Sequence, residues 1–400
     1  MIPKINEVIK SIPEALSIFI NQIVYDKVRK GERVYTFSLG EAFFDIPRFP
    51  IADDKFKTGY HYSSSMGQPK LRKKIANLYK NNYDAVVDYE NEMLISAGSK
   101  IIIYMLLQTV LNDGDEVLVH EPEWLSYKEQ IKLCKGKHVP IPYDKKVREW
   151  EPFITKQTKV IIINNPNNPS GYLYSHDDLQ YLLELAQKHN LFILSDEAYS
   201  DFILPNDNFI SFASVDLNKE HCLVVNSLSK NMGMSGWRVG YAIAHKTVIA
   251  QLKKLNQHLI TCASTVLQDY MADHFEDILT YTIPQAVEMA AKRKKVQNII
   301  DKLGLKYLQG TCTFYLMLNV SEFVGTTEEL VYDLLINHNI ALVPGIAYGE
   351  STRDFVRFGI GVESLEDIEK CLKEIKRHLS MDVYDNCLIR QQMKAYGVCS

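Results

Sequence analysis

Residues 227–238 of the chain read SLSKNMGMSGWR, and they closely follow the apolar run Leu223–Val225, which predicts a buried strand. The stretch therefore leaves a sheet edge as a polar loop with serine hydroxyls, an amine, two glycines and a guanidinium. These groups suit a phosphorylated aldehyde, because the amine of Lys230 can form an imine while the hydroxyls and Arg238 donate to the phosphate. An ordinary Ser/Gly loop is the other interpretation of this segment alone.

Short apolar strands alternate with helices through the middle of the chain. We expect strands at residues 93–97, 117–120, 139–141, 160–163, 191–194 and 223–225, and helices at 68–80, 101–111, from about 124, and at 177–189. This alternation predicts an α/β fold with a mostly parallel central sheet and helices on both of its faces. Ligands of such sheets bind at the carboxyl ends of the strands, where every motif described below falls.

The two ends of the chain differ from this middle part. The expected elements are an N-terminal helix within residues 5–30, a short strand at 34–39, helices at 251–275 and 284–303, a strand pair at 313–318 and 355–360, and an amphipathic helix at 365–379. They indicate a smaller α+β domain formed by both chain ends. We predict an N-terminal segment (residues 1–50) and a C-terminal region (285–400) for it, around a large cofactor-binding domain (51–284), with 381–400 as a polar appendage.

Composition narrows the class of protein. Four hundred residues suggest about two domains, and 46% hydrophobic with 24% charged residues is typical of a globular protein. A net charge of −4, with both signs spread along the chain, gives no reason to expect nucleic acid or a membrane as partner. Small molecules are the expected partners.

The sequence also bears on the compartment. The longest apolar run, Ile101–Leu107, is far too short to span a membrane, and the N-terminus does not resemble a secretory signal. The seven cysteines are widely spaced and include no C-x-x-C pair, so we expect reduced thiols and neither a disulfide framework nor a zinc site. We therefore expect a cytoplasmic protein.

Two turns at strand ends could bind a phosphorylated ring. Gly98, Ser99 and Lys100 lie between a strand and a helix, where backbone donors and the helix dipole favour a phosphate, although many such turns bind nothing. Residues 164–171 read NNPNNPSG after a buried strand, and their asparagines are free to hydrogen-bond a ring substituent. A plain Asx/Pro turn is the alternative for the second motif.

Asp196 and Tyr199 follow the strand predicted at residues 191–194. A carboxylate opposite a pyridine nitrogen keeps that nitrogen protonated, so that the ring withdraws electrons from a carbanion; a helix cap is the alternative role for Asp196. Trp124 could stack on a planar cofactor or pack in the core. Arg357 is a charge inside the apolar run 355–359, and its partner is either a substrate carboxylate or a structural ion pair.

Together these stretches resemble the fold-type I pyridoxal-phosphate aminotransferases of class I/II, and the similarity extends from Gly40 to the final helix. The family motif S-x-S-K, with an arginine eight residues after the lysine, is intact at Ser227–Arg238, and N-N-P-x-N-P-[ST]-G is intact at Asn164–Gly171. The resemblance implies pyridoxal 5′-phosphate as cofactor and transfer of an amino group between an L-amino acid and a 2-oxo acid in two half-reactions. A β-lyase, a cyclising synthase or a decarboxylase on the same fold is the alternative.

The resemblance also implies roles for individual residues. Lys230 would bind the cofactor covalently and carry the proton, with Asp196 and Tyr199 as the other catalytic residues. The substrate would contact Gly40, Asn168 and Arg357, and no metal is expected. The cofactor would contact Gly98, Ser99, Lys100, Trp124, Asn168, Asp196, Tyr199, Ser227, Ser229, Lys230 and Arg238, and Tyr62 from the neighbouring subunit of a homodimer.

One loop departs from the family pattern. The family usually reads G-E-P-D-F where this chain has GEAFF at residues 40–44, so a proline and a carboxylate are lost. We find no unambiguous second arginine for a distal carboxylate. From Ile18, Phe19, Phe43 and Phe44 we predict an apolar or aromatic side chain on the amino donor. A transcription regulator that uses this fold as a sensor is disfavoured, because no basic DNA-binding segment precedes the motifs.

Overall fold

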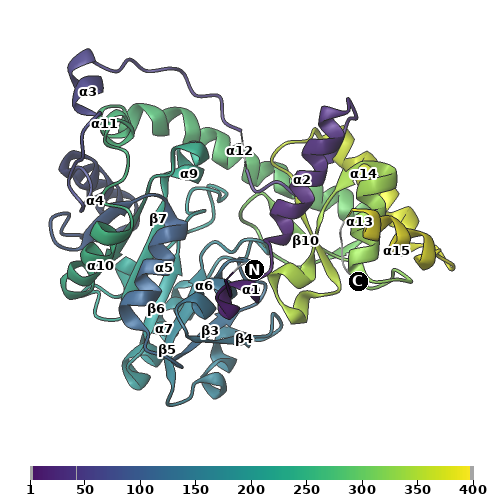
Figure 1. Ribbon diagram of the computed structural model, residues 1–400, viewed down its shortest axis with the longest axis horizontal. Helices are drawn as coiled ribbons and strands as arrows, with labels where there is room; N and C mark the ends of the chain where they lie inside the picture. The colour runs from purple at the N-terminus through teal and green to yellow at the C-terminus, as the bar shows by residue number, and fades with distance from the viewer. Residues whose placement is uncertain (1–2, 42, 397–400) are drawn as a thin grey trace.

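The computed structural model describes residues 3–41 and 43–396, and its larger part is built on a seven-stranded sheet (Figure 1). The strand order is β2-β8-β7-β6-β5-β3-β4, and only β8 runs antiparallel to its neighbours. The bounds are β2 (Met93–Ser96), β3 (Glu116–His120), β4 (Lys137–Ile141), β5 (Thr158–Asn164), β6 (Phe192–Asp196), β7 (Cys222–Ser227) and β8 (Gly240–Ala244). The predicted α/β fold with a mostly parallel sheet is confirmed.

Helices cover both faces of this sheet. Successive strand residues point to opposite faces, and in these strands the residues on both faces are apolar. In β5, Ile161 and Ile163 pack with the helices of one face, whereas Val160 and Ile162 pack with those of the other. The first face carries α4 (Pro69–Tyr83), α7 (His176–His189), α8 (Phe212–Val215) and α11 (Thr265–Asp273), and the second carries α5 (Ser99–Val110), α6 (Tyr127–Leu133) and α10 (Lys246–Leu259). The sheet is therefore buried on both faces, and the ends of its strands are the places where a ligand can bind.

A second, antiparallel sheet lies in the other part of the molecule. Its strand order is β12-β13-β10-β9, and β10 pairs with β13 so that Met317 lies opposite Arg357. The bounds are β9 (Lys306–Tyr307), β10 (Tyr315–Asn319), β12 (Val343–Pro344) and β13 (Phe355–Gly359), with α13 (Thr327–His338) and α14 (Leu365–Leu379) packed on the sheet.

The N-terminal end of the chain joins this second part. The short strand β1 (Tyr35–Thr36) pairs in parallel with β11 (Ile340–Ala341), and α2 (Leu16–Arg29) buries Ile20, Ile23 and Val24 in the same core. Both chain ends thus contribute to the smaller α+β part, as the sequence predicted.

A single helix, α12 (Phe275–Lys302), connects the two parts (Figure 1). Its contacts include α9 (Leu228–Asn231) and α11 on one side and α14 on the other. Pro284 lies inside this helix. The domain boundaries at residues 50 and 284 stay a prediction, and the second of them falls within a continuous helix.

Two expected helices are each divided into two. Residues 5–30 form α1 (Glu7–Lys10) and α2, and Pro13 lies between them, where it cannot donate a backbone hydrogen bond. Residues 251–275 contain α10 and α11 rather than one helix, and Thr261 in the connection has a positive φ of 75°. Pro13 is a local signal for the first break, whereas residues 251–275 contain no Gly or Pro to mark the second.

Short elements complete the connections between these sheets and helices. They are α3 (Asp53–Thr58), η1 (Val147–Glu149), η2 (Glu151–Phe153), η3 (Ser235–Trp237), η4 (Gly345–Tyr348) and η5 (Glu350–Thr352).

The described part of the tail is not an appendage. It forms α15 (Asn386–Ala395), which packs on α13 and buries Ile389 and Met393. Arg390 Nε donates to Glu329 Oε1 across 2.5 Å. The expectation was wrong because two apolar residues four positions apart suffice to give a short helix one buried face.

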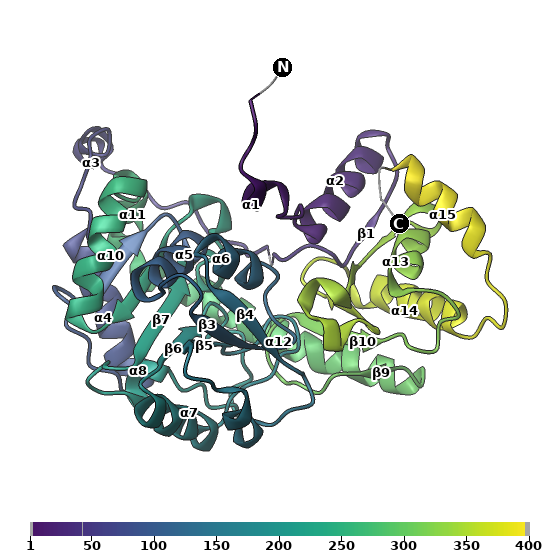
Figure 2. The ribbon, with the colours of Figure 1, turned by 60° about the horizontal axis from the view of Figure 1, so that its bottom comes forward.

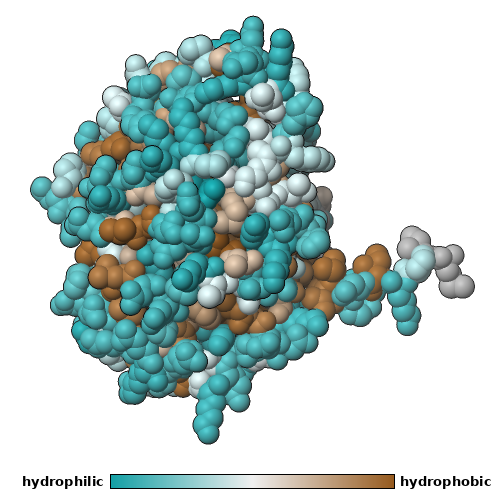
Figure 3. Space-filling model, turned by 90° about the vertical axis from the view of Figure 1, so that its left-hand side faces the viewer, coloured by the Kyte–Doolittle hydropathy of each residue, from teal (hydrophilic) through white to brown (hydrophobic). Residues whose placement is uncertain are grey.

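The N-terminal segment before Ser11 projects from the molecule (Figures 2 and 3), and the backbone oxygen of Ser11 accepts from Lys132 Nζ on α6 across 3.1 Å. Ile5, Val8 and Ile9 in this segment are all exposed. No helix among the described residues is long and apolar enough to cross a membrane.

Candidate active site

A cavity of about 220 Å³ lies where the carboxyl ends of the large sheet meet the second part of the chain. Its walls come from strand ends of the large sheet, from α2, from the loop before Glu41, and from β10 and β13. The lining residues are Ser17, Asn21, Ser38, Gly40, Ser99, Lys100, Trp124, Leu125, Asn164, Asn168, Asp196, Ala198, Tyr199, Ser227, Ser229, Lys230, Ser235, Arg238, Tyr315 and Arg357. The cavity thus collects the side chains of nearly all the predicted site residues.

The ends of β5 and β6 are joined by hydrogen bonds at the cavity floor. Asn164 Nδ2 donates to the backbone oxygen of Asp196 across 2.8 Å, and Asn164 Oδ1 accepts from the backbone N–H of Asn168 across 2.6 Å. Because these bonds fix the turn against the neighbouring strand, Asn168 and Asp196 keep a constant separation. The motif at residues 164–171 thus joins two strand ends at the cavity, and binding of a ring by its asparagines stays a prediction.

Asp196 is a buried carboxylate with a hydroxyl partner. Tyr127 Oη, from α6, donates to Asp196 Oδ2 across 2.7 Å. Burial raises the pKa of Asp196 to about 6, although the bonds from Tyr127 and from the N–H of Ala198 oppose the shift. The carboxylate accepts from the N–H of Ala198, but α8, the next helix along the chain, begins only at Phe212, so the helix-cap interpretation is wrong.

Lys230 belongs to α9, which begins directly after β7. Its Nζ donates to the backbone oxygen of Gly40 across 2.5 Å and lies 5.7 Å from the centroid of the Tyr199 ring. Burial lowers the pKa of the Lys230 ammonium to about 8, and Glu41 opposes this shift. The lowered pKa increases the fraction of the amine that is uncharged near neutral pH, which is the form that acts as a nucleophile or base.

One end of the cavity gathers cations and hydroxyls at the N-terminus of α5. Gly98 precedes this helix with a positive φ of 93°, and a Cβ on it would approach Arg238 Nη2 to 2.5 Å. Lys100 Nζ lies 5.1 Å from the Trp124 ring, and its pKa is lowered by burial and by Arg238. The hydroxyl of Ser229 is buried without a hydrogen-bond partner among the described residues. The cations, hydroxyls and backbone donors at this end of the cavity suit an anion such as phosphate.

Three polar side chains form a chain of contacts at the opposite edge of the floor. Asn168 Nδ2 donates to the Tyr199 hydroxyl across 3.3 Å, and that hydroxyl lies 3.0 Å from the hydroxyl of Tyr315. Burial raises the pKa of Tyr199 well above its ordinary value, so it stays protonated. Tyr199 can therefore donate a hydrogen bond into the cavity.

Arg357 projects from β13 and contacts backbone and aromatic rings. Its Nη2 donates to the backbone oxygen of Ser38 across 2.6 Å, and the guanidinium carbon lies 4.7 Å from the Tyr315 ring and 5.2 Å from the Tyr348 ring. Its Nε is buried and has no partner among the described residues. The observed partner is a carbonyl and not a carboxylate, which leaves the positive charge for a bound anion.

Several predicted residues do not line the cavity. Tyr62 is 87% exposed, and Gly98 lies beneath Arg238 rather than at the cavity wall. Ile18 and Phe43 are exposed, Phe44 stacks on Phe202 with centroids 5.9 Å apart, and Phe19 packs in the core of the smaller part. The four apolar side chains therefore do not form a wall for a substrate, and the basis of the predicted donor preference is corrected.

Other residues at the site escaped the sequence analysis. Tyr127 follows Trp124 by three positions, across the turn that precedes α6, and the two rings are in edge contact with their centroids 5.3 Å apart. Ser17 and Asn21 on α2 are four positions apart, about one helical turn, and this spacing is a local signal that both face the same side of the helix. Tyr315 carries no such local signal, because its position depends on how β10 pairs with β13.

A buried amine, a buried carboxylate and a cationic helix N-terminus around one cavity define an enzyme site for a phosphorylated carbonyl compound. The chain matches the model of the family described as aminotransferase class I and II over residues 50–375. The chain therefore belongs to the class I and II aminotransferases and is a pyridoxal-phosphate-dependent aminotransferase.

The relatives agree with this assignment. The chain is 30% identical to aspartate aminotransferase of Pyrococcus abyssi over 88% of its own length and 95% of that protein. It is 29% identical to aromatic-amino-acid aminotransferase 2 of Thermococcus litoralis, with the same coverage. The solved structure of Thermus thermophilus aspartate aminotransferase with maleate has a TM-score of 0.84 at 25% identity and covers 94% of this chain and 100% of that one.

The residues present fit pyridoxal 5′-phosphate. The unpartnered hydroxyl of Ser229 and the unpartnered Oδ1 of Asn168 are buried polar groups that a ligand would satisfy. The cations Lys100 and Arg238 match a phosphate, and Asp196 matches a protonated ring nitrogen.

Proposed function

We propose that the enzyme moves an amino group between an L-amino acid and a 2-oxo acid by a ping-pong mechanism with two half-reactions. When bound, pyridoxal phosphate supplies an electron sink for the negative charge that develops at the substrate Cα. The observation that carries the proposal is that Lys230, Asp196 and Arg357 line one cavity. The reaction needs a base, a partner for the ring and an anchor for the substrate, and these three residues supply them.

We assign the proton transfer to Lys230. Its amine would take the proton from the substrate Cα and return it to the neighbouring carbon of the cofactor. A pKa of about 8 suits both steps, because the amine can lose and regain a proton near neutral pH. The carbonyl of Gly40, which accepts from Lys230 Nζ, would hold the amine between the two positions.

Asp196 and Tyr199 would tune the cofactor from opposite edges. The carboxylate of Asp196 would hold the ring nitrogen protonated, and that positive charge would in turn lower the pKa of Asp196 below its value of about 6. Tyr199 and Asn168 would donate to the phenolic oxygen, and Trp124 would stack on the ring.

The phosphate would be held by residues at the N-terminus of α5 and around α9. Those residues are Gly98, Ser99, Lys100, Ser227, Ser229 and Arg238. Backbone donors and two cations there would offset the phosphate charge.

We propose that Arg357 binds the α-carboxylate of the substrate. The guanidinium is fixed between two aromatic rings and by Ser38, so it would meet the carboxylate with little loss of conformational freedom. Gly40 would border the same group.

An amino donor with an apolar or aromatic side chain stays a prediction, although the four apolar residues on which it was based do not line the cavity. The wall from α2 is polar, with Ser17 and Asn21. These side chains favour a second candidate, a donor with a polar or acidic side chain. The relatives named as aspartate and as aromatic aminotransferases support one candidate each.

We also propose a homodimer in the cytoplasm. Tyr62 is 87% exposed, and Ile5, Val8 and Ile9 are exposed on the projecting N-terminal segment, as expected for groups that contact another subunit. The described cysteines are free thiols, which supports a reducing compartment.

A screen of donors against acceptors with the cofactor-loaded enzyme tests these proposals. Beyond the one equivalent per site that the first half-reaction releases, we expect each productive amino acid to yield its keto acid only in proportion to the acceptor that is aminated. Release of ammonia or carbon dioxide without an aminated acceptor would instead identify a lyase or a decarboxylase. Ranking aspartate, glutamate, leucine, methionine and phenylalanine by kcat/KM decides between the two donor classes.

A further inference from the structure

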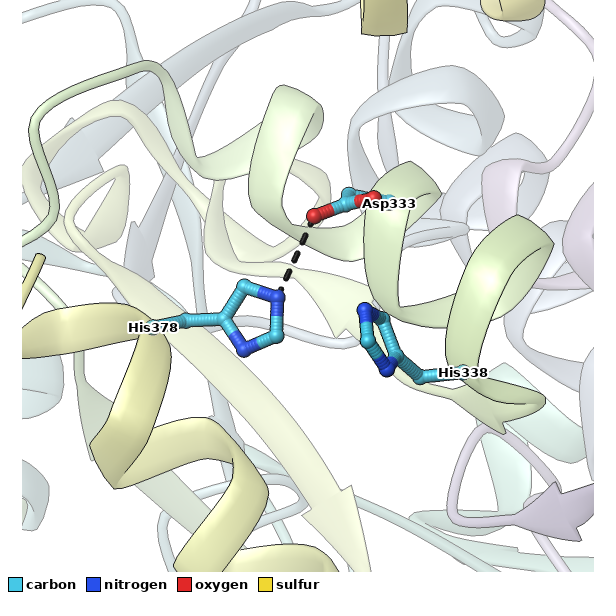
Figure 4. Close-up of side chains that lie close together, drawn as sticks. All are labelled: Asp333, His338 and His378. Carbon is cyan, nitrogen blue, oxygen red and sulfur yellow. Dashed lines mark hydrogen bonds and ion pairs between the residues drawn. The ribbon is translucent and has the colours of Figure 1, made fainter. Parts of the chain in front are cut away.

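Three side chains with potential metal-ligating atoms converge in the smaller part (Figure 4), and none of them lines the cavity. Asp333 and His338 lie on α13, and His378 lies on α14. One potential ligand atom from each lies within 4.8 Å of the others. We propose that these three residues bind a divalent transition-metal ion, with zinc as the best fit, and that the ion ties the two helices together.

Each ligand is held by a neighbour through the atom that would not touch the metal. Asn337 Nδ2 donates to Asp333 Oδ1 across 2.6 Å, so the other oxygen, Asp333 Oδ2, is the one that faces His378 Nε2. The backbone oxygen of Glu374 accepts from His378 Nδ1 across 2.9 Å, which leaves His378 Nε2. Such contacts orient ligands in known metal sites, where a histidine donates its other nitrogen to a carbonyl or carboxylate.

His338 has the same arrangement. Its Nδ1 lies 3.2 Å from Glu374 Oε1, so its remaining ring nitrogen is Nε2. The two imidazole centroids are 4.8 Å apart with planes at 86°, and Figure 4 shows the three side chains facing one another. All three ligands therefore have a second partner, and two of these partners belong to Glu374.

The ligand types suit zinc, and the three ligand atoms, which lie within 4.8 Å of one another, would move closer together around an ion. Nitrogen and carboxylate ligands lie about 2.0–2.2 Å from zinc, so neighbouring ligands of a tetrahedral ion are roughly 3.3 Å apart. His378 Nε2 and Asp333 Oδ2 are 3.2 Å apart. Two imidazoles and one carboxylate fill three positions, and the partly exposed His338 side chain leaves a route for the ion and for water as fourth ligand.

A simple ion pair between His378 and Asp333 is the competing explanation. In that case His378 would carry protons on both nitrogens, and His338 would contribute nothing beyond its contact with Glu374. The two explanations differ in what His338 does, which makes this residue the one to change. Its side chain is 30% exposed, so its replacement leaves the core intact.

The test is a titration of the cofactor-loaded, tag-free full chain with zinc chloride after treatment with a chelator. We expect one equivalent of zinc per chain, loss of this binding in His338→Ala, and binding weakened about 10–100-fold in Glu374→Gln. A matched control is His189→Ala, because His189 forms a similar pair with Glu151 across 2.9 Å and belongs to no such cluster among the described residues. That variant should bind zinc like the unaltered protein.

Cobalt provides an independent readout. Bound at this site, Co²⁺ should give the visible absorption of a four-coordinate ion, and zinc should displace it. His378→Asn should lose this absorption, with circular dichroism used to verify that the variant is folded. Absence of stoichiometric zinc binding to the unaltered chain would overturn the proposal, and so would equal binding by His338→Ala. Neither result depends on transaminase activity.

Discussion

The two sides of the cavity are assembled in different ways. The cofactor side consists of short contiguous motifs at the ends of neighbouring strands, such as Asn164–Gly171 after β5 and Ser227–Arg238 at the end of β7. The substrate side collects single residues from distant parts of the chain: Ser17 and Asn21 on α2, Tyr315 on β10 and Arg357 on β13. The first side is therefore fixed by one sheet, and the second by how the smaller part packs against it.

This difference has a functional meaning that kinetics can reveal. Groups on the sheet side would act on the cofactor in the transition state, and their loss should lower kcat. Groups on the other side would hold the substrate before and during the reaction, and their loss should mainly raise KM.

The largest expected effect is that of Lys230→Ala. Without the amine, no group among the cavity-lining residues described replaces it as a base, so we expect kcat to fall by about 10⁴-fold or more. The steady-state rate with the best donor measures this effect. Lys253→Ala, an exposed lysine of α10, is the control and should retain full activity. A folded Lys230→Ala variant with more than about one-hundredth of the activity would contradict the assigned role.

The acidity of the same amine predicts a pH profile. Burial lowers the pKa of Lys230 from 10.5 to about 8. In the cofactor-free protein, the fraction of the Lys230 amine that is uncharged therefore increases as the pH rises towards 8. The rate at which added pyridoxal phosphate is bound covalently should rise about tenfold per pH unit between pH 6 and 8 and then level off. Stopped-flow absorbance measures this rate. A rate that keeps rising to pH 10 would show that the lysine is not perturbed.

The cofactor side was largely predictable from the sequence, since Lys230, Asp196 and Asn168 each lie in a motif that needs only one strand end to position it. The substrate side was not. Residues 40–44 have no periodicity to tell which side chains face inward, so the aromatic Phe43 and Phe44 were wrongly placed at the substrate. Tyr315 reaches the cavity only through strand pairing at long range.

The same limit explains the rest of the fold. The strands of the large sheet were found because each is a short apolar run between turns. The division of 251–275 into α10 and α11 was missed, because the apolar pattern continues across the break at Thr261. Asp333 and His378 are 45 residues apart, so no motif spacing indicated that they meet.

Arg357→Lys probes the substrate side. The charge remains, but the planar fork of donors and its contacts with the rings of Tyr315 and Tyr348 are lost. We expect KM for the amino donor to rise about tenfold or more, with a smaller change in kcat, as judged from full saturation curves. Arg353→Lys, on the exposed loop before β13, is the matched control. A fall in kcat at constant KM would contradict this role and would indicate that Arg357 acts on the cofactor in the transition state.

Tyr315→Phe has the smallest expected effect and addresses the boundary between the two sides. Its hydroxyl lies 3.0 Å from that of Tyr199, so it is the substrate-side group in direct contact with a residue assigned to the cofactor. Loss of one such hydrogen bond is worth about 0.5–1.5 kcal/mol, which corresponds to a roughly 2–10-fold lower kcat/KM. Tyr307→Phe, on the edge strand β9, should be neutral.

The informative measurement is a double-mutant cycle between Tyr315→Phe and Tyr199→Phe. If the two hydroxyls act together, the double variant should be little worse than Tyr199→Phe alone, because either change breaks the same contact. Additive losses would show that the cofactor and substrate sides work independently despite their contact. In that case the way the smaller part packs against the large sheet would affect substrate binding. It would not affect the reaction at the cofactor ring.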